Sequence, residues 1–310
     1  MREIKNGMSR FRELDGESKV MQKLRERINK VSQFDERVMI LGPSGVGKET
    51  VAQQLHRCGP RKNGPFIPVC CSSVAPDLLV SEFFGYVKGA FTGANADKKG
   101  YLESADKGTL FLDEIGEMTL PCQKALLRAL EEQSFSRVGS SEQIPVNFRL
   151  ITATNQDLVA MVKKGTFRED LFHRLNVIRL DIPALKEHIE DVDGIARRWW
   201  KKKTNKEILP STLETLKGYP FPGNIRELQN VLSRIYVFGE DETKTVIKEQ
   251  EDLHLAIGAS SCEGPEELPE ELDAAIRHHV RRILEECGGN KSLAAERLKC
   301  SRNTVVKYAR

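Results

Sequence analysis

The sequence lacks the segments that direct a chain into or across a membrane. No apolar run approaches the ~18–20 residues that a membrane-spanning helix needs. The first twelve residues are polar and lack the apolar core of a signal peptide. The seven cysteines form no C-x-x-C pair and have no histidine at matching spacing, which disfavours disulfide and zinc frameworks. We therefore expect a cytoplasmic protein with reduced thiols and no membrane partner.

The net charge of +3 is small, but the charges are unevenly distributed along the chain. Residues 240–273 contain twelve acidic residues and two lysines, whereas residues 290–310 contain six basic residues and one acidic residue. An acidic stretch before a basic terminus is typical of a solvated linker that carries a nucleic-acid-binding tail. The 310 residues are enough for about two domains.

Short apolar runs alternate with helical segments over the first part of the chain. The spacing of Val51, Ala52 and Leu55 predicts a helix over residues 49–58. Alternation of this kind predicts an α/β domain with a parallel sheet and helices on both of its faces. The expected strands are residues 37–41, 66–71, 109–113 and 149–154.

Helical periodicity dominates from residue 187 onward, which predicts a helical subdomain after the α/β domain. Asn224 is expected to be the N-cap of a helix that runs to about Phe238. An earlier helix is indicated by an apolar stripe of Ile189, Val192, Ile195, Ala196 and Trp199.

A glycine-rich loop follows the first expected strand and precedes the first helix. In that position backbone N–H groups can surround a phosphate at the positive end of a helix, with Lys48 reaching the β- and γ-phosphates. The context favours a P-loop. The Ser or Thr expected next, as a Mg²⁺ ligand, is Glu49 here, and Thr50 is one place too late. The loop comprises Gly42, Pro43, Ser44, Gly45, Val46, Gly47 and Lys48.

An apolar strand delivers two carboxylates sixty-five residues after Lys48. We expect Asp113 to hold Mg²⁺ and Glu114 to orient and polarise the attacking water. At the end of the next strand, Asn155 is our candidate for a side chain that senses the γ-phosphate, with a capping role as the alternative. Together these residues predict a site that binds ATP with Mg²⁺.

Residues 167–175 carry two arginines, Arg168 and Arg174. Six residues correspond to about 240° of helical rotation, so the two side chains do not share a helix face. The residues alone favour ordinary surface arginines.

The sequence GAFTGA lies between the P-loop and the acidic strand end. Its composition suits a loop tip that contacts a partner, because glycine permits positive φ and Phe91 offers apolar area at low entropy cost. Composition alone would favour an ordinary glycine-rich surface turn. The six residues are Gly89, Ala90, Phe91, Thr92, Gly93 and Ala94.

Together these segments resemble the AAA+ activators of sigma-54 RNA polymerase, the bacterial enhancer-binding proteins, over almost the whole chain from about residue 14. In that family Glu replaces the usual Ser or Thr after the P-loop lysine, so Glu49 supports the resemblance. The segments that carry it are GPSGVGKE at 42–49, SEFFGYVKGAFTGA at 81–94, GTLFLDEIGEM at 108–118, FREDLFHRLNV at 167–177 and YPFPGNIRELQN at 219–230.

The resemblance implies an AAA+ P-loop ATPase with an α-helical lid, assembled as a ring that is usually a hexamer. It implies that Arg168 and Arg174 contact a neighbour's nucleotide and that Arg226 contacts ATP within its own subunit. Hydrolysis would then move the GAFTGA loops, with Phe91 and Thr92 as working contacts, against sigma-54 and remodel the closed promoter complex.

The C-terminal residues predict an all-α helix-turn-helix. Helical spacing covers residues 272–287, Gly288-Gly289 ends that helix, and Ser301 can cap a third helix after a short second one. The tail resembles the Fis-type DNA-binding domain of the same family, with a small dimerising helical hairpin as the alternative. Base contacts are expected from Arg302, Asn303 and Thr304, and phosphate contacts from Lys307 and Arg310.

Two departures from the family pattern bear on regulation. The family usually has Asn-Cys where this chain has Cys70-Cys71, and that Asn is thought to hold the catalytic Glu in an inactive position. A thiol is a weak hydrogen-bond partner, so we expect measurable basal ATPase activity. Many relatives also carry an N-terminal receiver or sensor domain, and here only a short tail precedes the ATPase. We expect control by a separate protein, by expression level or by mixed assembly with a paralogue.

The expected organisation is a tail at 1–12, an ATPase subdomain at 13–180, a lid at 181–250, an acidic linker at 251–270 and a DNA-binding domain at 271–310. The expected function is ATP-driven activation at sigma-54 promoters from upstream DNA. One alternative is a DNA-binding regulator or co-activator subunit with weak or uncoupled ATPase activity. Another AAA+ machine, such as a replication initiator or helicase loader, is disfavoured because those classes have no reason to carry GAFTGA.

Overall fold

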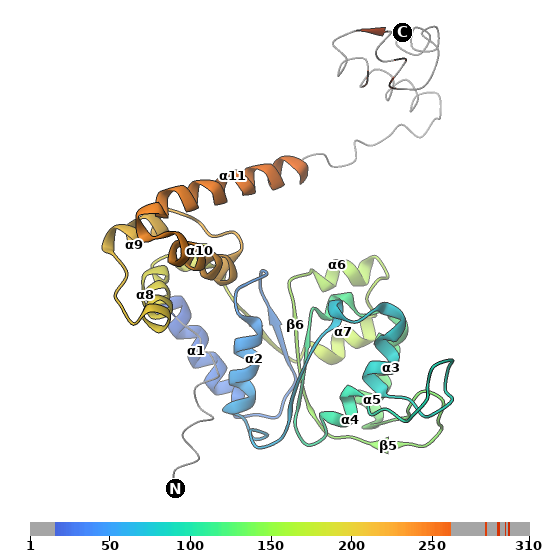
Figure 1. The fold of residues 1–310 in the computed structure, drawn as a ribbon. Coiled ribbons are helices and arrows are strands. Elements are labelled where there is room, and N and C mark those ends of the chain that lie inside the picture. Colours follow the sequence, from blue (N-terminus) through green and yellow to red (C-terminus); the bar gives the residue numbers. More distant parts are fainter. Residues whose placement is uncertain (1–15, 262–282, 284–289, 292–294, 296, 298–310) are drawn as a thin grey trace. The chain divides into compact units, whose positions relative to one another are not determined.

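The computed structural model describes residues 16–261 together with residues 283, 290, 291, 295 and 297. The chain divides into two compact units, Met1–Ile247 and Lys248–Arg310. The first unit combines an α/β part with a group of helices (Figure 1). Among the described residues, no helix has both the length and the apolar character that crossing a membrane requires.

A five-stranded sheet forms the centre of the α/β part, and every strand pair in it is parallel. The strand order is β2-β3-β6-β1-β7. Four strands lie where the sequence predicts them, whereas the edge strand β7 is not predicted. The strands are β1 (Val38–Leu41), β2 (Phe66–Cys70), β3 (Thr109–Asp113), β6 (Arg149–Thr154) and β7 (Ile178–Asp181).

Helices cover both faces of the sheet because successive strand residues point to opposite sides. In β3, Leu110 and Leu112 pack on one side, whereas Phe111 packs on the other. The Phe111 side carries α1 (Lys19–Ser32) and α2 (Lys48–Arg57). The opposite side carries α3 (Leu79–Phe84), α4 (Tyr101–Ser104), α5 (Leu120–Glu132), α6 (Leu158–Lys163) and α7 (Glu169–Leu175).

Arg149, at the start of β6, is a buried cation that binds backbone carbonyls at the C-terminal ends of α1 and α2. Its guanidinium donates to the carbonyls of Val31 at 3.2 Å, Leu55 at 3.1 Å and Glu36 at 3.2 Å. The C-terminal end of a helix carries partial negative charge on its free carbonyls, which a cation stabilises. Arg149 therefore fixes the two helices that flank β1 and the P-loop.

A separate apolar core holds the helical subdomain together. The predicted stripe is observed, with Val192, Ile195 and Ala196 buried, but Trp200 rather than Trp199 is the fully buried indole. The helices are α8 (Asp191–Thr204), α9 (Pro210–Lys217) and α10 (Asn224–Phe238), and the start of α11 (Thr243–Ser261) joins the same core.

The expected boundary between lid and linker at residue 250 falls inside α11, so residues 251–261 continue that helix. Residues 262–270 lie outside the described part. In the predicted DNA-binding tail, Ile283 and Ala295 are both helical and buried.

Candidate nucleotide site and loop tip

The P-loop runs from the end of β1 to the first turn of α2 and packs against the start of α10. Gly45 has a positive φ of +79°, and a Cβ added to it would lie 2.3 Å from the carbonyl oxygen of Gly223. No side chain fits there without displacing backbone. Glycine at position 45 therefore allows the lid to approach the loop closely.

Asn224 connects the P-loop to the lid, which the sequence did not predict. Its Nδ2 donates to the Ser44 carbonyl at 2.9 Å, and its Oδ1 accepts from the Leu185 backbone N–H at 2.8 Å. The expectation that Asn224 is the N-cap of α10 is wrong, because Gly223 occupies that position and Asn224 is the first helical residue. The amide is used for the loop contact instead of for capping.

Arg226, in the first turn of the same helix, contacts the same loop. Its Nη1 donates to the Ser44 hydroxyl at 3.0 Å, and its backbone N–H donates to the Gly45 carbonyl at 3.2 Å. A lid guanidinium thus lies at the surface of the P-loop, where it can meet an anion bound by the loop.

Lys48 is the buried cation of the loop. Its Nζ donates to the carbonyls of Gly42 at 2.8 Å and Pro43 at 3.0 Å. Burial lowers the pKa of Lys48, and the nearby carboxylates of Asp113 and Glu114 oppose that effect. The Lys48 ammonium thus lies inside the loop, near two carboxylates. This arrangement suits a phosphate group that binds together with a metal cation.

Asp113 ends β3 and faces this region. Its Oδ1 accepts from the Glu114 backbone N–H at 3.0 Å. Burial raises the pKa of Asp113, while that N–H and Lys48 act in the opposite direction. A partly buried carboxylate next to a phosphate-binding loop has the chemistry of a Mg²⁺ ligand, so the residues present fit that ion.

The carboxylates of Glu114 and Glu49 are bound by partners outside the P-loop. Glu114 has a left-handed backbone conformation with φ of +53°, and its Oε2 accepts a hydrogen bond from the Ser72 hydroxyl. Glu49 is exposed on α2 and accepts from Gln53 Nε2 at 3.0 Å. The structure therefore places the Glu49 carboxylate at the helix surface.

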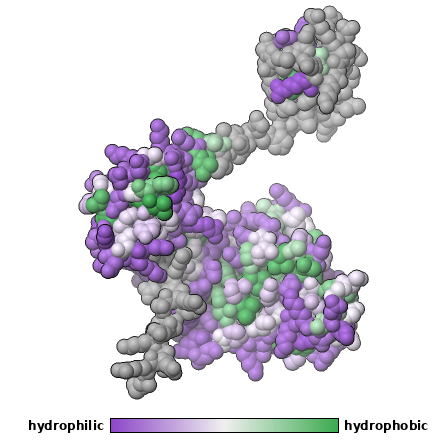
Figure 2. All heavy atoms as spheres, in the orientation of Figure 1, coloured by the Kyte–Doolittle hydropathy of each residue, from purple (hydrophilic) through white to green (hydrophobic). Residues whose placement is uncertain are grey.

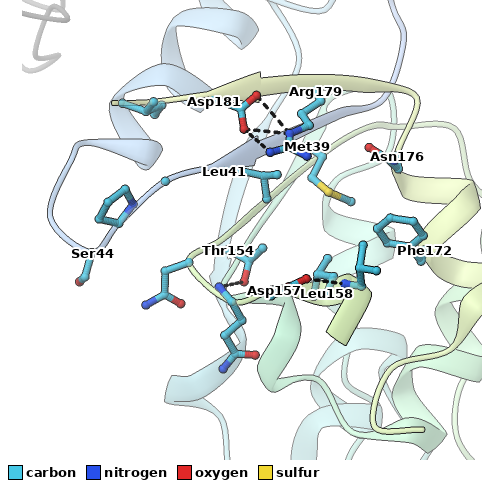
Figure 3. A pocket seen from close by; sticks show the side chains of 16 residues that line it. Met39, Leu41, Ser44, Thr154, Asp157, Leu158, Phe172, Asn176, Arg179 and Asp181 are labelled. Atoms are coloured by element: carbon cyan, nitrogen blue, oxygen red, sulfur yellow. Dashed lines mark hydrogen bonds and ion pairs between the residues drawn. The ribbon is translucent and has the colours of Figure 1, made fainter. Parts of the chain in front are cut away.

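A groove of about 760 Å³ flanks the P-loop on the β7 side. Met39 and Leu41 of β1 and Phe172 of α7 line it, and an ion pair between Arg179 and Asp181 closes one edge (Figure 3). Asn155, directly after β6, is exposed in this groove together with Pro43 and Ser44. The structure thus brings the candidate γ-phosphate sensor to the P-loop.

The two candidate arginine fingers lie at opposite ends of α7. Arg168 is the N-cap residue and forms an ion pair with Asp170 at 2.6 Å. Arg174 is exposed in the last turn and donates to the Leu130 carbonyl at 3.4 Å. Among the described residues, neither guanidinium has a hydrogen bond or ion pair with the P-loop of its own chain.

The GAFTGA residues form a closed turn with an exposed tip. The Gly89 N–H donates to the Ala94 carbonyl at 2.9 Å, and the Ala94 N–H donates to the Phe91 carbonyl at 3.0 Å. Ala94 is buried, whereas Phe91, Thr92 and Gly93 are exposed. Phe91 keeps 42% of its surface exposed while its ring packs edge-on against Tyr86 at 4.9 Å.

A hairpin that the sequence did not predict supports this turn. Its strands are β4 (Ser134–Phe135) and β5 (Ile144–Pro145). Within it, the Val138 carbonyl accepts from the Val87 N–H at 3.1 Å. A Cβ added to Gly139 would lie 2.7 Å from the Cβ of Ala90. The loop tip therefore rests directly on the backbone of the hairpin.

The candidate DNA-contacting residues Arg302, Asn303, Thr304 and Lys307 lie outside the described residues.

Three families match consecutive parts of the chain. Residues 14–181 match the sigma-54 interaction domain, and residues 179–268 match the AAA+ ATPase lid domain. Residues 277–307 match the Fis family of bacterial regulatory proteins. The first two matches meet at the end of β7, where the α/β part gives way to the lid.

Curated relatives are similar over most of the chain. It is 41% identical to the response regulator protein PilR of Pseudomonas aeruginosa over 91% of its length, and it covers 66% of PilR. It is also 41% identical to the regulatory protein AtoC of Escherichia coli over 89% of its length, and it covers 62% of AtoC. The chain thus spans about two thirds of the length of these relatives.

Solved structures agree with the fold. The crystal structure of NtrX from Brucella abortus in complex with ATP has 32% identity, a TM-score of 0.67, and coverage of 96% of this chain and 69% of NtrX. The structure of NtrX in complex with ADP matches with a TM-score of 0.67 and 30% identity, covering 96% of this chain and 68% of NtrX. From these matches and the geometry of its P-loop, lid and loop tip, the chain belongs to the sigma-54-dependent AAA+ transcriptional activators with a Fis-type DNA-binding domain.

Proposed function

We propose that this protein binds upstream DNA and uses ATP hydrolysis to remodel the closed complex of sigma-54 RNA polymerase into an open complex. One observation carries the proposal. The P-loop, held by the lid residues Asn224 and Arg226, and an exposed aromatic loop tip belong to the same compact unit. A nucleotide-dependent change at the P-loop can therefore be transmitted to a surface that contacts a partner.

The residues around the P-loop have separable roles in hydrolysis. Backbone N–H groups of Gly42 and of residues 44–47, together with the Lys48 ammonium, bind the phosphates, and Arg226 contacts them from the lid. Glu114 orients and polarises the attacking water, and Asn155 senses the γ-phosphate from the end of β6. Asp113 would hold Mg²⁺, which neutralises charge on the phosphates when it is bound.

Arg168 and Arg174 act on the nucleotide of a neighbouring subunit. The two arginines lie at the ends of α7, and among the described residues neither guanidinium bonds to its own P-loop. Each can leave its present partner at small cost because it is partly or fully exposed. Figure 2 shows hydrophobic residues gathered around α6 and α7, and Val159 and Val177 are about half exposed there. A ring, with six subunits as the proposed number, would cover this surface and complete each site.

The exposed tip of the GAFTGA turn contacts sigma-54. Phe91 and Thr92 make the contact, Gly89 and Gly93 permit the turn with φ of +83° and +103°, and Ala94 anchors it in the protein. Ala90 holds the turn against the hairpin.

Outside the ATPase, we propose the domain limits given above, with the DNA contacts in residues 302–307. A separate regulatory protein or a paralogue that joins the ring would provide control, and the cytoplasm is the proposed location.

A regulator or co-activator subunit with weak or uncoupled ATPase activity is the second candidate. The observation that favours it is the contact of Glu114 with Ser72 and Cys70, which holds the catalytic carboxylate in place.

Replacing Thr92 by alanine tests the role of the loop tip. The Thr92→Ala variant should lose open-complex formation at a sigma-54 promoter, by about a hundredfold if the contact is a central one. Its ATP hydrolysis and DNA binding should stay close to those of the unmodified protein, because Thr92 lies outside both sites. Lys62→Ala, a change at an exposed position in the turn between α2 and β2, is the control and should leave all three activities unchanged. Activation that survives Thr92→Ala would refute the assigned role.

A further inference from the structure

The catalytic carboxylate has two partners on one short segment, the 3₁₀ turn η1 (Cys71–Ser73) with the preceding Cys70. The Ser72 hydroxyl donates to Glu114 Oε2, and the Cys70 thiol lies 3.6 Å from the same oxygen. The turn itself is fixed by the Ser73 hydroxyl, which donates to the Cys70 carbonyl at 2.8 Å. A rigid turn therefore presents both groups to Glu114.

The order of the strands shows in which direction the carboxylate is held. Glu114 follows β3, η1 follows β2, and the P-loop follows β1. In the order β2-β3-β6-β1-β7, β2 and β1 lie on opposite sides of β3. Cys70 and Asp113 are register partners, so the ends of β2 and β3 are adjacent. The Glu114 carboxylate is thus held on the β2 side of β3, by partners that lie outside the P-loop.

Of the two partners, Ser72 makes the stronger contact. A hydroxyl that donates to a carboxylate forms a charge-assisted hydrogen bond, whereas a thiol is a weak donor at a longer distance. Ser72 is exposed, so its hydroxyl does not support the protein core. The interaction with Glu114 is the one contact among the described residues in which the Ser72 side chain donates to an ionised group.

We propose that Ser72 is a positioning residue that restrains Glu114 and slows ATP hydrolysis until the carboxylate is released. The proposal rests on the assignment of Glu114 as the catalytic residue. Cys70 plays a minor part in the restraint.

The same segment leads toward the sigma-54 contact. After η1 the chain forms η2 (Pro76–Leu78), continues directly into α3, and enters the loop that carries Phe91. Leu79 and Phe83 of α3 are fully buried in the core that also contains Cys71. Release of Glu114 from Ser72 therefore acts on a rigid connection between the nucleotide site and the loop tip.

The hydroxyl can be removed without disturbing the turn. Ser72→Ala should raise kcat for ATP hydrolysis about tenfold, the size expected for one hydrogen bond to a charged group. KM and the directly measured Kd for ATP should change by less than about twofold, because the P-loop is untouched. Ser72→Thr keeps the hydroxyl and should restore the original kcat. Ser211→Ala, which removes an exposed hydroxyl on α9 of the lid and leaves the η1 turn intact, is the control.

Alkylation of Cys70 by iodoacetamide, followed by peptide mass spectrometry, reports on the restraint without turnover. In the unmodified protein, a non-hydrolysable ATP analogue should speed the labelling of Cys70, because the carboxylate leaves the thiol. In Ser72→Ala, labelling should be fast without any nucleotide. Exposed Cys58 serves as the fast reference, and buried Cys71 and Cys122 as the slow ones.

The outcomes separate this inference from the proposed function. An inactive Glu114→Gln variant combined with an unchanged or lowered kcat in Ser72→Ala would overturn the restraint alone. Equal Cys70 labelling in Ser72→Ala and the unmodified protein would do the same. Normal hydrolysis by Glu114→Gln would overturn the catalytic assignment itself.

Discussion

A single buried carboxylate, Asp191, joins the first helix of the α/β part to the lid. Its Oδ2 accepts from the Ser18 hydroxyl at 2.6 Å and lies 2.9 Å from His188 Nδ1. Its Oδ1 accepts from the backbone N–H groups of Glu17 and Ser18. Burial by itself would raise the pKa of Asp191, but the hydrogen bonds outweigh it and the pKa is lowered. Asp191 thus stabilises the folded protein in its charged form.

Asp191→Asn should reduce the free energy of unfolding at neutral pH by roughly 2–4 kcal/mol, since the amide cannot accept all of these bonds. A folded-state pKa below the unfolded value of 3.8 gives stability that is present above that pH and is lost as the pH falls through the folded pKa. The difference between the two proteins should therefore be constant from about pH 7 to 5 and shrink below pH 4. Urea unfolding over this range measures it.

Asp193→Asn is the matched control on the same helix. Asp193 forms ion pairs with Arg197 and Lys217 at a partly exposed position. The Asp193→Asn substitution should lower the free energy of unfolding by no more than about 1 kcal/mol. An Asp191→Asn protein as stable as this control would show that the buried contact does not secure the lid.

At the scale of elements, the sequence predicts what repeats locally and misses what depends on distant contacts. The four predicted strands, β1, β2, β3 and β6, follow from their apolar runs, because each lies between helical segments. Strand β7 has only four residues, too few for their alternation to identify it, and its pairing with β1 makes it a strand. Asn224 has the sequence of a cap, yet its amide is used by a loop 180 residues away.

The candidate site shows the same division. Lys48, Asp113 and Glu114 can be named from motifs, because their chemistry requires fixed positions after a strand. Ser72 carries no such signal, since its contact with Glu114 joins residues 42 positions apart. The hairpin beneath the GAFTGA turn was missed because its strands have two residues each, too few to show periodicity.

That hairpin makes a prediction at the element scale. In Gly139→Ala the new methyl group would meet Ala90, so the turn that carries Phe91 must shift. Open-complex formation should fall by about tenfold or more, while ATP hydrolysis stays within about twofold, because the hairpin supplies no residue to the nucleotide site. The two activities, measured on the same preparation, check this.

Gly165→Ala controls for backbone strain. Gly165 has a similar φ, +73° against +84° for Gly139, but an added Cβ would meet no described atom within 4 Å. Activation should stay near normal in this variant. Equal losses in both variants would mean that strain, and not the contact with Ala90, explains the effect.

At the scale of the whole molecule, each nucleotide site is proposed to be shared between subunits. Lys48→Ala and Arg174→Ala should each abolish ATPase activity. Lys48→Ala removes a phosphate ligand from the P-loop of its own subunit, and Arg174→Ala removes a contact with the nucleotide of the neighbouring subunit. Mixing them should restore part of the activity, because an intact P-loop then meets an intact Arg174 at some interfaces. Steady-state ATPase measurements across mixing ratios test this.

Arg128→Ala is the control for that mixture, since Arg128 is exposed on α5. This variant should be active alone and give no gain on mixing beyond simple dilution. The absence of any gain in the Lys48→Ala and Arg174→Ala mixture would place Arg174 in its own subunit's site or outside catalysis.

Open-complex formation at a sigma-54 promoter by the purified protein, with holoenzyme and no added regulator, tests the central claim most directly. Permanganate reactivity of the promoter thymines should appear with ATP and stay absent with a non-hydrolysable analogue. That result would establish an ATP-driven remodeller that works with Glu114 restrained by Ser72. Hydrolysis of ATP without promoter melting, by protein bound to its DNA, would contradict the account and favour a co-activator subunit.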